Sequence, residues 1–237
     1  FDLRLILEEI IRNEEDTEEA IAFLHEAHCA FRQVNPQFID ALILSNHDQD
    51  RIGSLLKGNL NHLKVAANLL LTLPGLPYLY YGEEIGMLGL KPDENIREPF
   101  VWDVGKQDPH RARWRKARYS TSRTVVPLAR QESDPNSLFS HYKRLIHFRN
   151  GHPVLNDNQS VLEPSAIRQK GIVAFGRRSG DRSVLVVQNL MGQPQDVLIY
   201  PPGEADNKRI SLDTAGGAVQ ENGLLRLGAY GCVVLEA

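Results

Sequence analysis

The spacing of apolar residues predicts helices and two buried strands in the first two thirds of the chain. Isoleucines and leucines that recur every three or four residues indicate helices with one buried face. Two apolar runs without this spacing end abruptly in polar residues and predict buried strands. The expected helices cover 3–11, 16–31, 60–73 and 138–149, and the expected strands cover 38–45 and 77–81.

Polar residues indicate where two of these helices begin. Asp16, with Glu19 three residues later, resembles a capping box. Asp134 and Pro135 are expected to supply the cap and the first-turn proline of the helix over 138–149. The succession of strand, helix and strand predicts a βαβ unit with parallel strands.

Beyond Pro153 the helical spacing gives way to short β-rich runs. Turn signals such as Ser179-Gly180-Asp181 and Glu221-Asn222-Gly223 separate them. Short strands with regular turns are typical of an antiparallel sandwich, so two domains are predicted, 1–152 and 153–237. The expected strands of the second domain cover 172–175, 183–187, 197–200, 209–212 and 232–235.

Composition and charge are those of an ordinary globular protein. Of the 237 residues 42% are hydrophobic, and the formal net charge is -3. No apolar stretch is long enough to span a membrane, and the acidic balance argues against a nucleic-acid partner. Localisation and oligomeric state cannot be read from the sequence. A local basic cluster is interpreted as a solvated loop or helix face: Arg111, Arg113, Arg115, Lys116 and Arg118.

Few other residues suggest chemistry by themselves. Cys29 and Cys232 are both interpreted as small buried hydrophobic residues. His25, His28 and Cys29 have a spacing that a metal can use, but a helix face is the simpler interpretation, and no metal site is predicted. Phe1 lies inside an apparent helical pattern, so the chain is expected to start in the middle of a larger protein.

The tetrad Asn46-His47-Asp48-Gln49 follows the predicted strand over 38–45. In parallel α/β folds, sites are built at the carboxyl ends of strands. An acid, an imidazole and an amide can together hold a polar substrate and stabilise positive charge. Without further context, Asp48 is equally an ordinary loop or helix-cap residue.

A long polar loop over 88–136 follows the second predicted strand, and loops of this length are usually functional or mobile. Trp102 lies in this loop and is either a platform for a sugar ring or a packing residue. The same two interpretations apply to Tyr80, Tyr81 and Phe100.

Three segments resemble motifs of the α-amylase family of glycoside hydrolases. Residues 41–51, ALILSNHDQDR, resemble the family's fourth signature region, and residues 75–87, GLPYLYYGEEIGM, resemble its eighth barrel strand and the loop after it. KPDE at 91–94 with REPFVW at 97–102 resembles the loop that follows in bacterial α-amylases and α-glucosidases. The resemblance implies that 1–152 is the C-terminal portion of a (β/α)8 TIM barrel, from about helix 6 to helix 8, followed by the family's β-sandwich domain.

The resemblance also implies roles for single residues. Family enzymes use three carboxylates, and Asp48 matches only the third, which stabilises the transition state. His47 resembles the family's histidine that donates to a hydroxyl of the same sugar. From the residues themselves, Asn46 is expected to orient the loop beside the substrate, Trp102 is a candidate substrate-binding residue, and Arg51 is expected to pair with a barrel carboxylate such as Glu84 to fix the loop. No segment resembles the motifs that carry the nucleophile or the acid/base. The missing N-terminal half of the barrel is therefore an expected partner.

The resulting expectation is part of a retaining hydrolase of α-1,4-glucans such as starch and maltodextrin, with this chain inactive alone. No cofactor is expected in this chain, and calcium, common in the family, would be held largely by the missing part. An oligo-1,6-glucosidase or transglycosylase of the same family stays open as an alternative. So does a non-catalytic glucan-binding or structural module.

Overall fold

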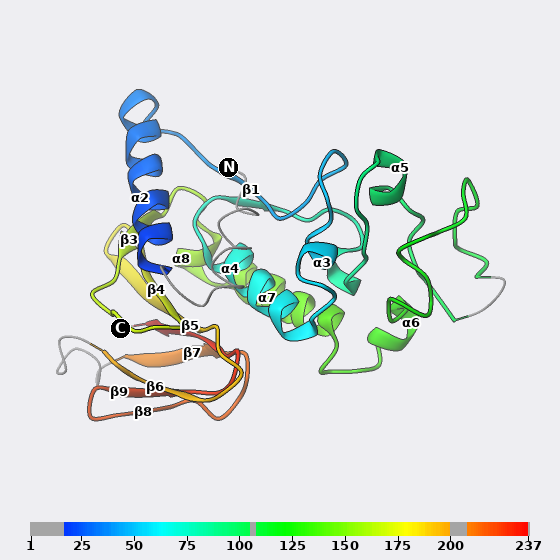
Figure 1. Ribbon diagram of the computed structural model, residues 1–237. Coiled ribbons are helices and arrows are strands. Elements are labelled where there is room, and N and C mark those ends of the chain that lie inside the picture. The colour runs from blue at the N-terminus through cyan, green and yellow to red at the C-terminus, as the bar shows by residue number, and fades with distance from the viewer. Residues whose placement is uncertain (1–16, 105–107, 200–207, 237) are drawn as a thin grey trace.

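The computed structural model describes residues 17–104, 108–199 and 208–236. The first part of the chain gathers its helices around a small parallel sheet, and the second part forms two antiparallel sheets beside those helices (Figure 1). The long loop between β2 and α7 projects to one side. Across the described ranges no helix combines the length and apolar character needed to cross a bilayer.

Strands β1 (Ala41–Ile43) and β2 (Leu76–Tyr78) pair in parallel over their full lengths. The helices between them are α3 (Ile52–Leu55) and α4 (Leu60–Thr72), which confirms the predicted βαβ unit. Both strands are shorter than the apolar runs that predicted them. A strand extends only as far as a neighbouring strand supplies hydrogen bonds, and within the described residues no third strand pairs with β1 or β2.

Helices α4 and α7 (Leu138–Gly151) pack against each other. Asn59 caps α4, because its side-chain oxygen accepts hydrogen bonds from the backbone amides of the first turn. The cap of α7 is Ser137, whose hydroxyl accepts from the backbone N of Ser140. The predicted cap at Asp134 and Pro135 is wrong, because the Asp134 carboxylate accepts from the backbone N of Asn136 in the turn before the helix.

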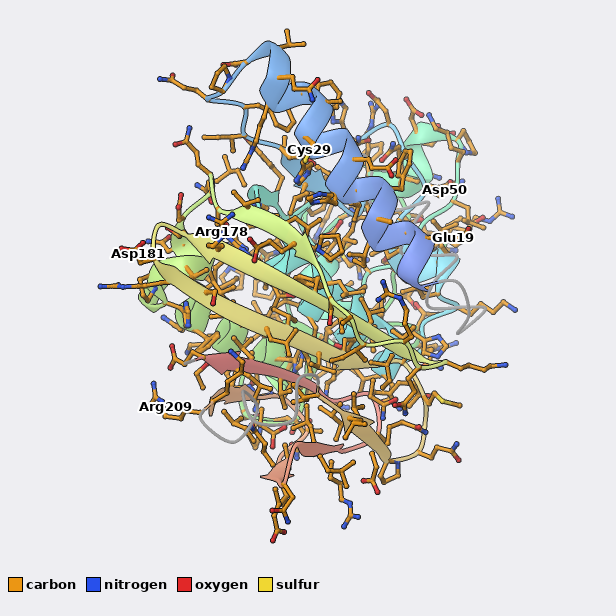
Figure 2. All side chains as sticks on the ribbon, turned by 90° about the vertical axis from the view of Figure 1, so that its left-hand side faces the viewer. Glu19, Cys29, Asp50, Arg178, Asp181 and Arg209 are labelled. Carbon is orange, nitrogen blue, oxygen red and sulfur yellow. The ribbon has the colours of Figure 1, made fainter. Side chains whose placement is uncertain are left out.

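Helix α2 (Thr17–Val34) lies against β3 and β4 (Figures 1 and 2). Ile21, Leu24 and His28 are buried. Cys29 is exposed, so its interpretation as a buried residue is wrong: it lies one position beyond the buried stripe of α2. The capping box at Asp16 and the helix expected over 3–11 lie outside the described residues.

The second part consists of two antiparallel sheets, one in the strand order β3-β4-β5-β10-β7 and the other β6-β9-β8. This confirms the predicted all-β region, although β3, β8 and β9 were not among the expected strands. Asn222 and Gly223 both have positive φ and turn β8 into β9, as their turn signal indicates. The bounds are β3 Val161–Pro164, β4 Ile172–Ser179, β5 Arg182–Asn189, β6 Gln195–Leu198, β7 Arg209–Asp213, β8 Val219–Glu221, β9 Leu224–Leu227 and β10 Cys232–Glu236.

The five-stranded sheet is buried on both faces. Along β10, Val233 and Leu235 pack in a cluster with side chains of the smaller sheet, whereas Cys232 and Val234 pack in the cluster that contains α4 and α7. The alternation of successive side chains between the faces of a strand produces this division. Cys232 is fully buried, as predicted, and burial raises the pKa of its thiol to about 12.

Two buried arginines bind the carboxyl end of α4, and one of them joins it to this sheet. Arg149 of α7 donates to the carbonyls of Leu71, Leu73 and Gly75 at the end of α4. Arg177 of β4 donates to the same helix end and also to the carbonyls of Val154, Leu155 and Asp157 in and after the short helix α8 (Pro153–Asn156). Carbonyls at a helix end have no partner within the helix, so these guanidinium groups satisfy them. The predicted boundary at 152/153 falls directly before α8 and stays a prediction.

A chain of buried side-chain hydrogen bonds makes a second connection. His141 of α7 donates from Nε2 to Asn68 of α4, and the Asn68 amide donates to Gln188 of β5. Gln188 in turn donates to backbone carbonyls beside β10. Burial, together with the nearby Arg144 charge, lowers the pKa of His141 to about 3, so its imidazole is neutral at ordinary pH.

Candidate active site

The tetrad lies where the chain leaves β1, at the carboxyl end of the parallel sheet. Asn46 shapes the turn, because its side-chain Oδ1 accepts from the backbone N of Asp48 at 2.8 Å. His47 Nε2 and Asp48 Oδ2 are 3.2 Å apart, and their side chains are 68% and 62% exposed. The structure thus presents an imidazole and a carboxylate side by side on an open surface.

Arg97 holds this pair from a distant segment. It follows helix α5 (Asp93–Ile96) and donates from Nε to the backbone carbonyl of His47 at 2.8 Å. Its Nη2 contacts Asp48 Oδ1 at 2.9 Å and Asp93 Oδ2 at 2.8 Å. Sequence reasoning placed Arg97 in a family-like segment but gave it no role. A contact across 49 positions leaves no periodic signal in one sequence.

Arg51 is fully buried and supports the tetrad loop, which covers residues 46–50 and ends directly before it. It donates from Nε to the carbonyl of Ile96 and from Nη1 to the carbonyl of Tyr81, and its guanidinium stacks on the rings of Tyr80 and Tyr81 at 4.4 and 4.7 Å. This arrangement ties the tetrad loop to β2 and α5. The two tyrosines therefore make packing contacts with Arg51.

The expected ion pair between Arg51 and Glu84 does not form. The backbone takes a left-handed conformation at Gly82, and the Glu84 carboxylate folds back to accept from the Gly82 backbone N at 2.7 Å. Glu83 is the acid that turns inward, in the 3-10 helix η1 (Glu83–Ile85). Burial raises the pKa of Glu83 to about 8, against the opposing effects of the Ser45 hydroxyl and the Arg51 charge.

Trp102 belongs to the long loop, and each contact described for it stays within that loop. Its ring packs on Phe100, with 4.4 Å between centroids, and meets the edge of His110. Its backbone N donates to Asp108 Oδ2 at 3.0 Å. The structure brings Asn46, His47 and Asp48 together but gives no contact that joins Trp102 to them.

Carboxylates organise the long loop, which also contains the short helix α6 (Leu128–Gln131). Glu98 is fully buried and accepts from the backbone amides of residues 118–120. Arg111 donates to the carbonyls of Pro99 and Ser120. At least one member of the basic cluster, Arg111, therefore has a structural function in the loop.

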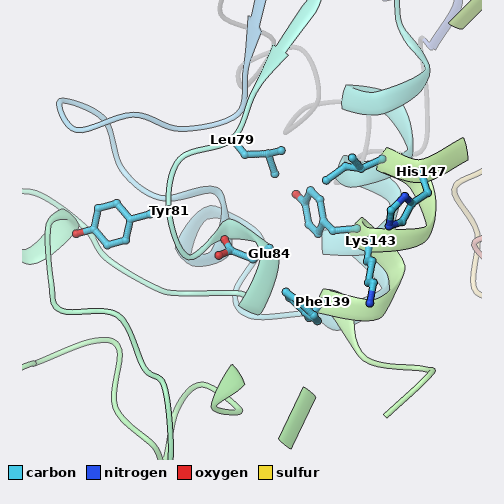
Figure 3. A pocket seen from close by; sticks show the side chains of 8 residues that line it. Leu79, Tyr81, Glu84, Phe139, Lys143 and His147 are labelled. Carbon is cyan, nitrogen blue, oxygen red and sulfur yellow. The ribbon is translucent and has the colours of Figure 1, made fainter. Parts of the chain in front are cut away.

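A pocket of about 490 Å³ opens beside β2 (Figure 3). Glu84 faces helix α7, which contributes Phe139, Lys143 and His147. Burial raises the pKa of the Glu84 carboxyl. None of the tetrad residues lines this pocket, so it is separate from the exposed carboxylate Asp48.

Within the described ranges no group of three or more histidines, cysteines, aspartates or glutamates has a geometry for a metal ion. His28 Nε2 instead contacts the buried Asp40 carboxylate at 3.0 Å, and this contact helps to lower the pKa of Asp40 against the opposing effect of burial. His25 bonds the carbonyl of Leu162.

Both the fold and the motifs define a class of carbohydrate-active barrel enzymes with an all-β C-terminal domain. A family model for the α-amylase catalytic domain matches residues 11–158, and one for the α-amylase SusG C-terminal domain matches residues 172–234. The chain belongs to the α-amylase family of glycoside hydrolases. Its first part is a portion of the family's catalytic barrel, and its second part is an all-β domain of antiparallel sheets.

Named relatives agree with this assignment. The chain is 38% identical to Alpha-amylase 3 of Dictyoglomus thermophilum over 170 residues, which are 72% of this chain and 34% of that protein. It is 32% identical to Alpha-amylase SusG of Bacteroides thetaiotaomicron over 209 residues, 84% of this chain and 29% of that protein. The chain therefore spans about a third of the length of these relatives.

Solved structures give the same result. The crystal structure of the alpha-amylase from H.orenii matches with a TM-score of 0.74 and 32% identity, covering 94% of this chain and 48% of that one. Eubacterium rectale Amy13B matches with a TM-score of 0.80 over 96% of this chain and 45% of that one, and at 20% identity it supports the fold alone.

Proposed function

We propose that the protein containing this chain is a retaining hydrolase of α-1,4-linked glucans, and that Asp48 stabilises its transition state. The observation that carries the proposal is the exposed Asp48 carboxylate at the carboxyl end of β1, beside His47 and oriented by Asn46 and Arg97. The positive charge that develops at the anomeric carbon is stabilised by a fixed carboxylate nearby. His47 donates to a hydroxyl of the same sugar, and Asn46 holds the turn.

This chain supplies one of the three carboxylates that such a reaction uses. Retention of configuration requires a nucleophile and an acid/base about 5–5.5 Å apart on opposite sides of the glycosidic bond. The carboxylate that shares Arg97 with Asp48 is Asp93, and it is already bound by Lys91 Nζ at 2.7 Å. Asp93 is therefore a structural anion in this site. The nucleophile and acid/base come from elsewhere in the protein, so this chain is inactive alone.

The remaining barrel strands are the partner that completes the site. Beside β2, the side chains of Leu76, Tyr78, Leu79 and Tyr81 are 38–52% exposed. The pocket of Figure 3 and a second pocket of about 230 Å³ run along the same side of β2. An unpaired strand edge flanked by apolar surface is normally covered. We infer that the N-terminal half of the barrel covers it.

The role of Asp48 is tested in the intact protein with Asp48→Asn. Turnover of maltooligosaccharides should fall by roughly 10²–10³-fold, the effect of removing one electrostatic stabiliser of a transition state. The unfolding midpoint should hardly change, because Asp48 is exposed. Unchanged turnover would remove the proposed role.

Substrate class is tested with the same protein. Release of reducing sugar from soluble starch by the intact protein, and none by the isolated chain, is the expected result. Binding of starch without release by the intact protein would instead favour a non-catalytic module. Faster turnover of isomaltose, or longer products formed from maltotriose, would favour an oligo-1,6-glucosidase or a transglycosylase.

A further inference from the structure

The contacts of Arg97 go beyond those of a loop anchor. We propose that Arg97 is a positioning residue for Asp48: it fixes the carboxylate in the orientation that faces the reacting sugar. This inference rests on the proposed function. It assigns to Arg97 an effect on turnover that is exerted through Asp48.

Arg97 is itself held before it reaches Asp48. It pairs with Asp93 four positions earlier, and Asp93 is also held by the ammonium of Lys91 at 2.7 Å. The backbone N of Arg97 bonds the carbonyl of Asp93, which closes the last turn of α5. A guanidinium whose side-chain torsions are fixed by one carboxylate loses less entropy when it binds a second.

Residues 91–97 bind the loop over 46–50 at two places. At one end, the backbone N of Lys91 donates to Asp50 Oδ1 at 2.6 Å. At the other end, Arg97 binds the backbone carbonyl of His47 and the side chain of Asp48. One guanidinium therefore holds both the main chain of this turn and its acidic side chain.

This geometry engages both oxygens of the Asp48 carboxylate. Arg97 contacts Oδ1, and His47 Nε2 lies 3.2 Å from Oδ2. Rotation about the last side-chain torsion of Asp48 would break both contacts. The guanidinium thus limits the orientations of a carboxylate that is otherwise 62% exposed. A catalytic group that is misplaced by about 1 Å can cost on the order of 10²-fold in rate.

If Arg97 only anchored the loop, its replacement would give a different result. An anchor of the loop would affect substrate binding and stability, with or without the carboxylate of Asp48. A positioning residue affects turnover, and only while Asp48 can act. The two are separated by measuring whether the effects of Arg97 and Asp48 are coupled.

The test is a double-mutant cycle in the intact protein with a maltooligosaccharide substrate. Arg97→Met should lower kcat about 10- to 100-fold, with KM changed less than about 3-fold. Arg97→Lys should recover part of that loss, because an ammonium retains the charge but not the planar fork. In the Asp48→Asn background, Arg97→Met should lower kcat no further. Arg123→Met, at an exposed position of the same long loop, is the matched control and should leave kcat unchanged.

The outcomes separate this inference from the proposed function. If Arg97→Met lowers kcat by the same factor with and without Asp48, or changes KM alone, the positioning role is overturned. If Asp48→Asn retains full turnover, the proposed function itself fails and the role of Arg97 fails with it. A loss in Arg97→Met that vanishes in the Asp48→Asn background supports both.

Discussion

Around Asp48 the charged groups are exposed and paired with one another, whereas at the carboxyl end of α4 two arginines are buried and bonded to backbone carbonyls. Arg97 holds Asp48 and Asp93 in open solvent. Arg149 and Arg177 are buried and satisfy the carbonyls of a helix end. Exposed ion pairs contribute little to stability, but groups that satisfy buried carbonyls are costly to remove. The buried arginines therefore stabilise the fold more than the exposed ion pairs around Asp48 do.

The largest expected effect is at Arg177, and its sequence neighbour provides the control. Arg177→Leu should lower the free energy of unfolding by about 3–5 kcal/mol, because the carbonyls of α4 and α8 lose their donor in a buried site. Arg178, the next residue of β4, lies near the end of the strand with its side chain exposed (Figure 2), and it is paired with Glu163. Arg178→Leu should cost less than about 1 kcal/mol. Urea unfolding of both variants checks this, and equal losses would contradict the contrast.

Two glycines with left-handed backbone, Gly82 after β2 and Gly180 in the turn between β4 and β5, give the next effect. Gly82 has φ 87°, and an added Cβ would lie 2.3 Å from Met87 Sδ. Gly180 has φ 58° with open space around it. Gly180→Ala should cost about 1 kcal/mol for the backbone alone, and Gly82→Ala about 2–4 kcal/mol because the clash adds to it. Thermal unfolding of the pair measures the difference, and Gly180→Ala as the more damaging change would refute it.

The two regions should respond to pH in opposite directions. Burial raises the pKa of Glu83 to about 8, so the folded state retains a proton that the unfolded chain releases, and stability should fall as pH rises from about 4.5 to 8. Burial lowers the pKa of His141 to about 3, so stability should fall as pH drops from 6.5 towards 3.

Single variants test which residue causes each of the two declines in stability with pH. Glu83→Gln should flatten the decline between pH 5 and 8, and His141→Gln should flatten the decline below pH 6. Urea midpoints across this range provide the measurement. If Glu83→Gln flattens the decline below pH 6, or His141→Gln flattens the decline above pH 5, then other groups are responsible for the two declines.

The smallest expected effect on stability is at Arg97. In the isolated chain, Arg97→Met should change the free energy of unfolding by less than about 1 kcal/mol, and added salt should reduce the difference further, since its partners are exposed. Chemical unfolding at low and high salt measures this. A loss comparable to that of Arg177→Leu would abolish the contrast between the exposed and the buried arginines.

The sequence predicted best what is determined locally. The helix over 60–73 and the tetrad at the end of β1 follow from spacing and from the switch between apolar and polar residues. β3 ends in a proline, β8 has three residues, and the LLRL of β9 does not alternate, so these strands gave no clear period. They form because neighbouring strands supply hydrogen-bond partners: β4 pairs with β3, and β9 pairs with both β8 and the more distant β6.

In the candidate site, positions were predictable but partners were not. Asp48, His47 and Asn46 occupy the expected turn. The pairing of Arg51 was mispredicted because a left-handed glycine decides which of two adjacent glutamates turns inward. Arg97 was missed because its contact with Asp48 depends on how the chain after α5 returns to the tetrad. A single sequence gives the residue types that can form such contacts but does not show which partner each side chain faces.

The doubly buried sheet has a consequence for recombination between relatives. Because β10 sends Cys232 and Val234 towards the helices and Val233 and Leu235 towards the smaller sheet, the C-terminal region is not an interchangeable module. A chimera joined between α8 and β4 would have to match Arg177 to a foreign helix end and Gln188 to a foreign asparagine. Viable crossover points should therefore lie before α4, so that the helices and the five-stranded sheet are inherited together.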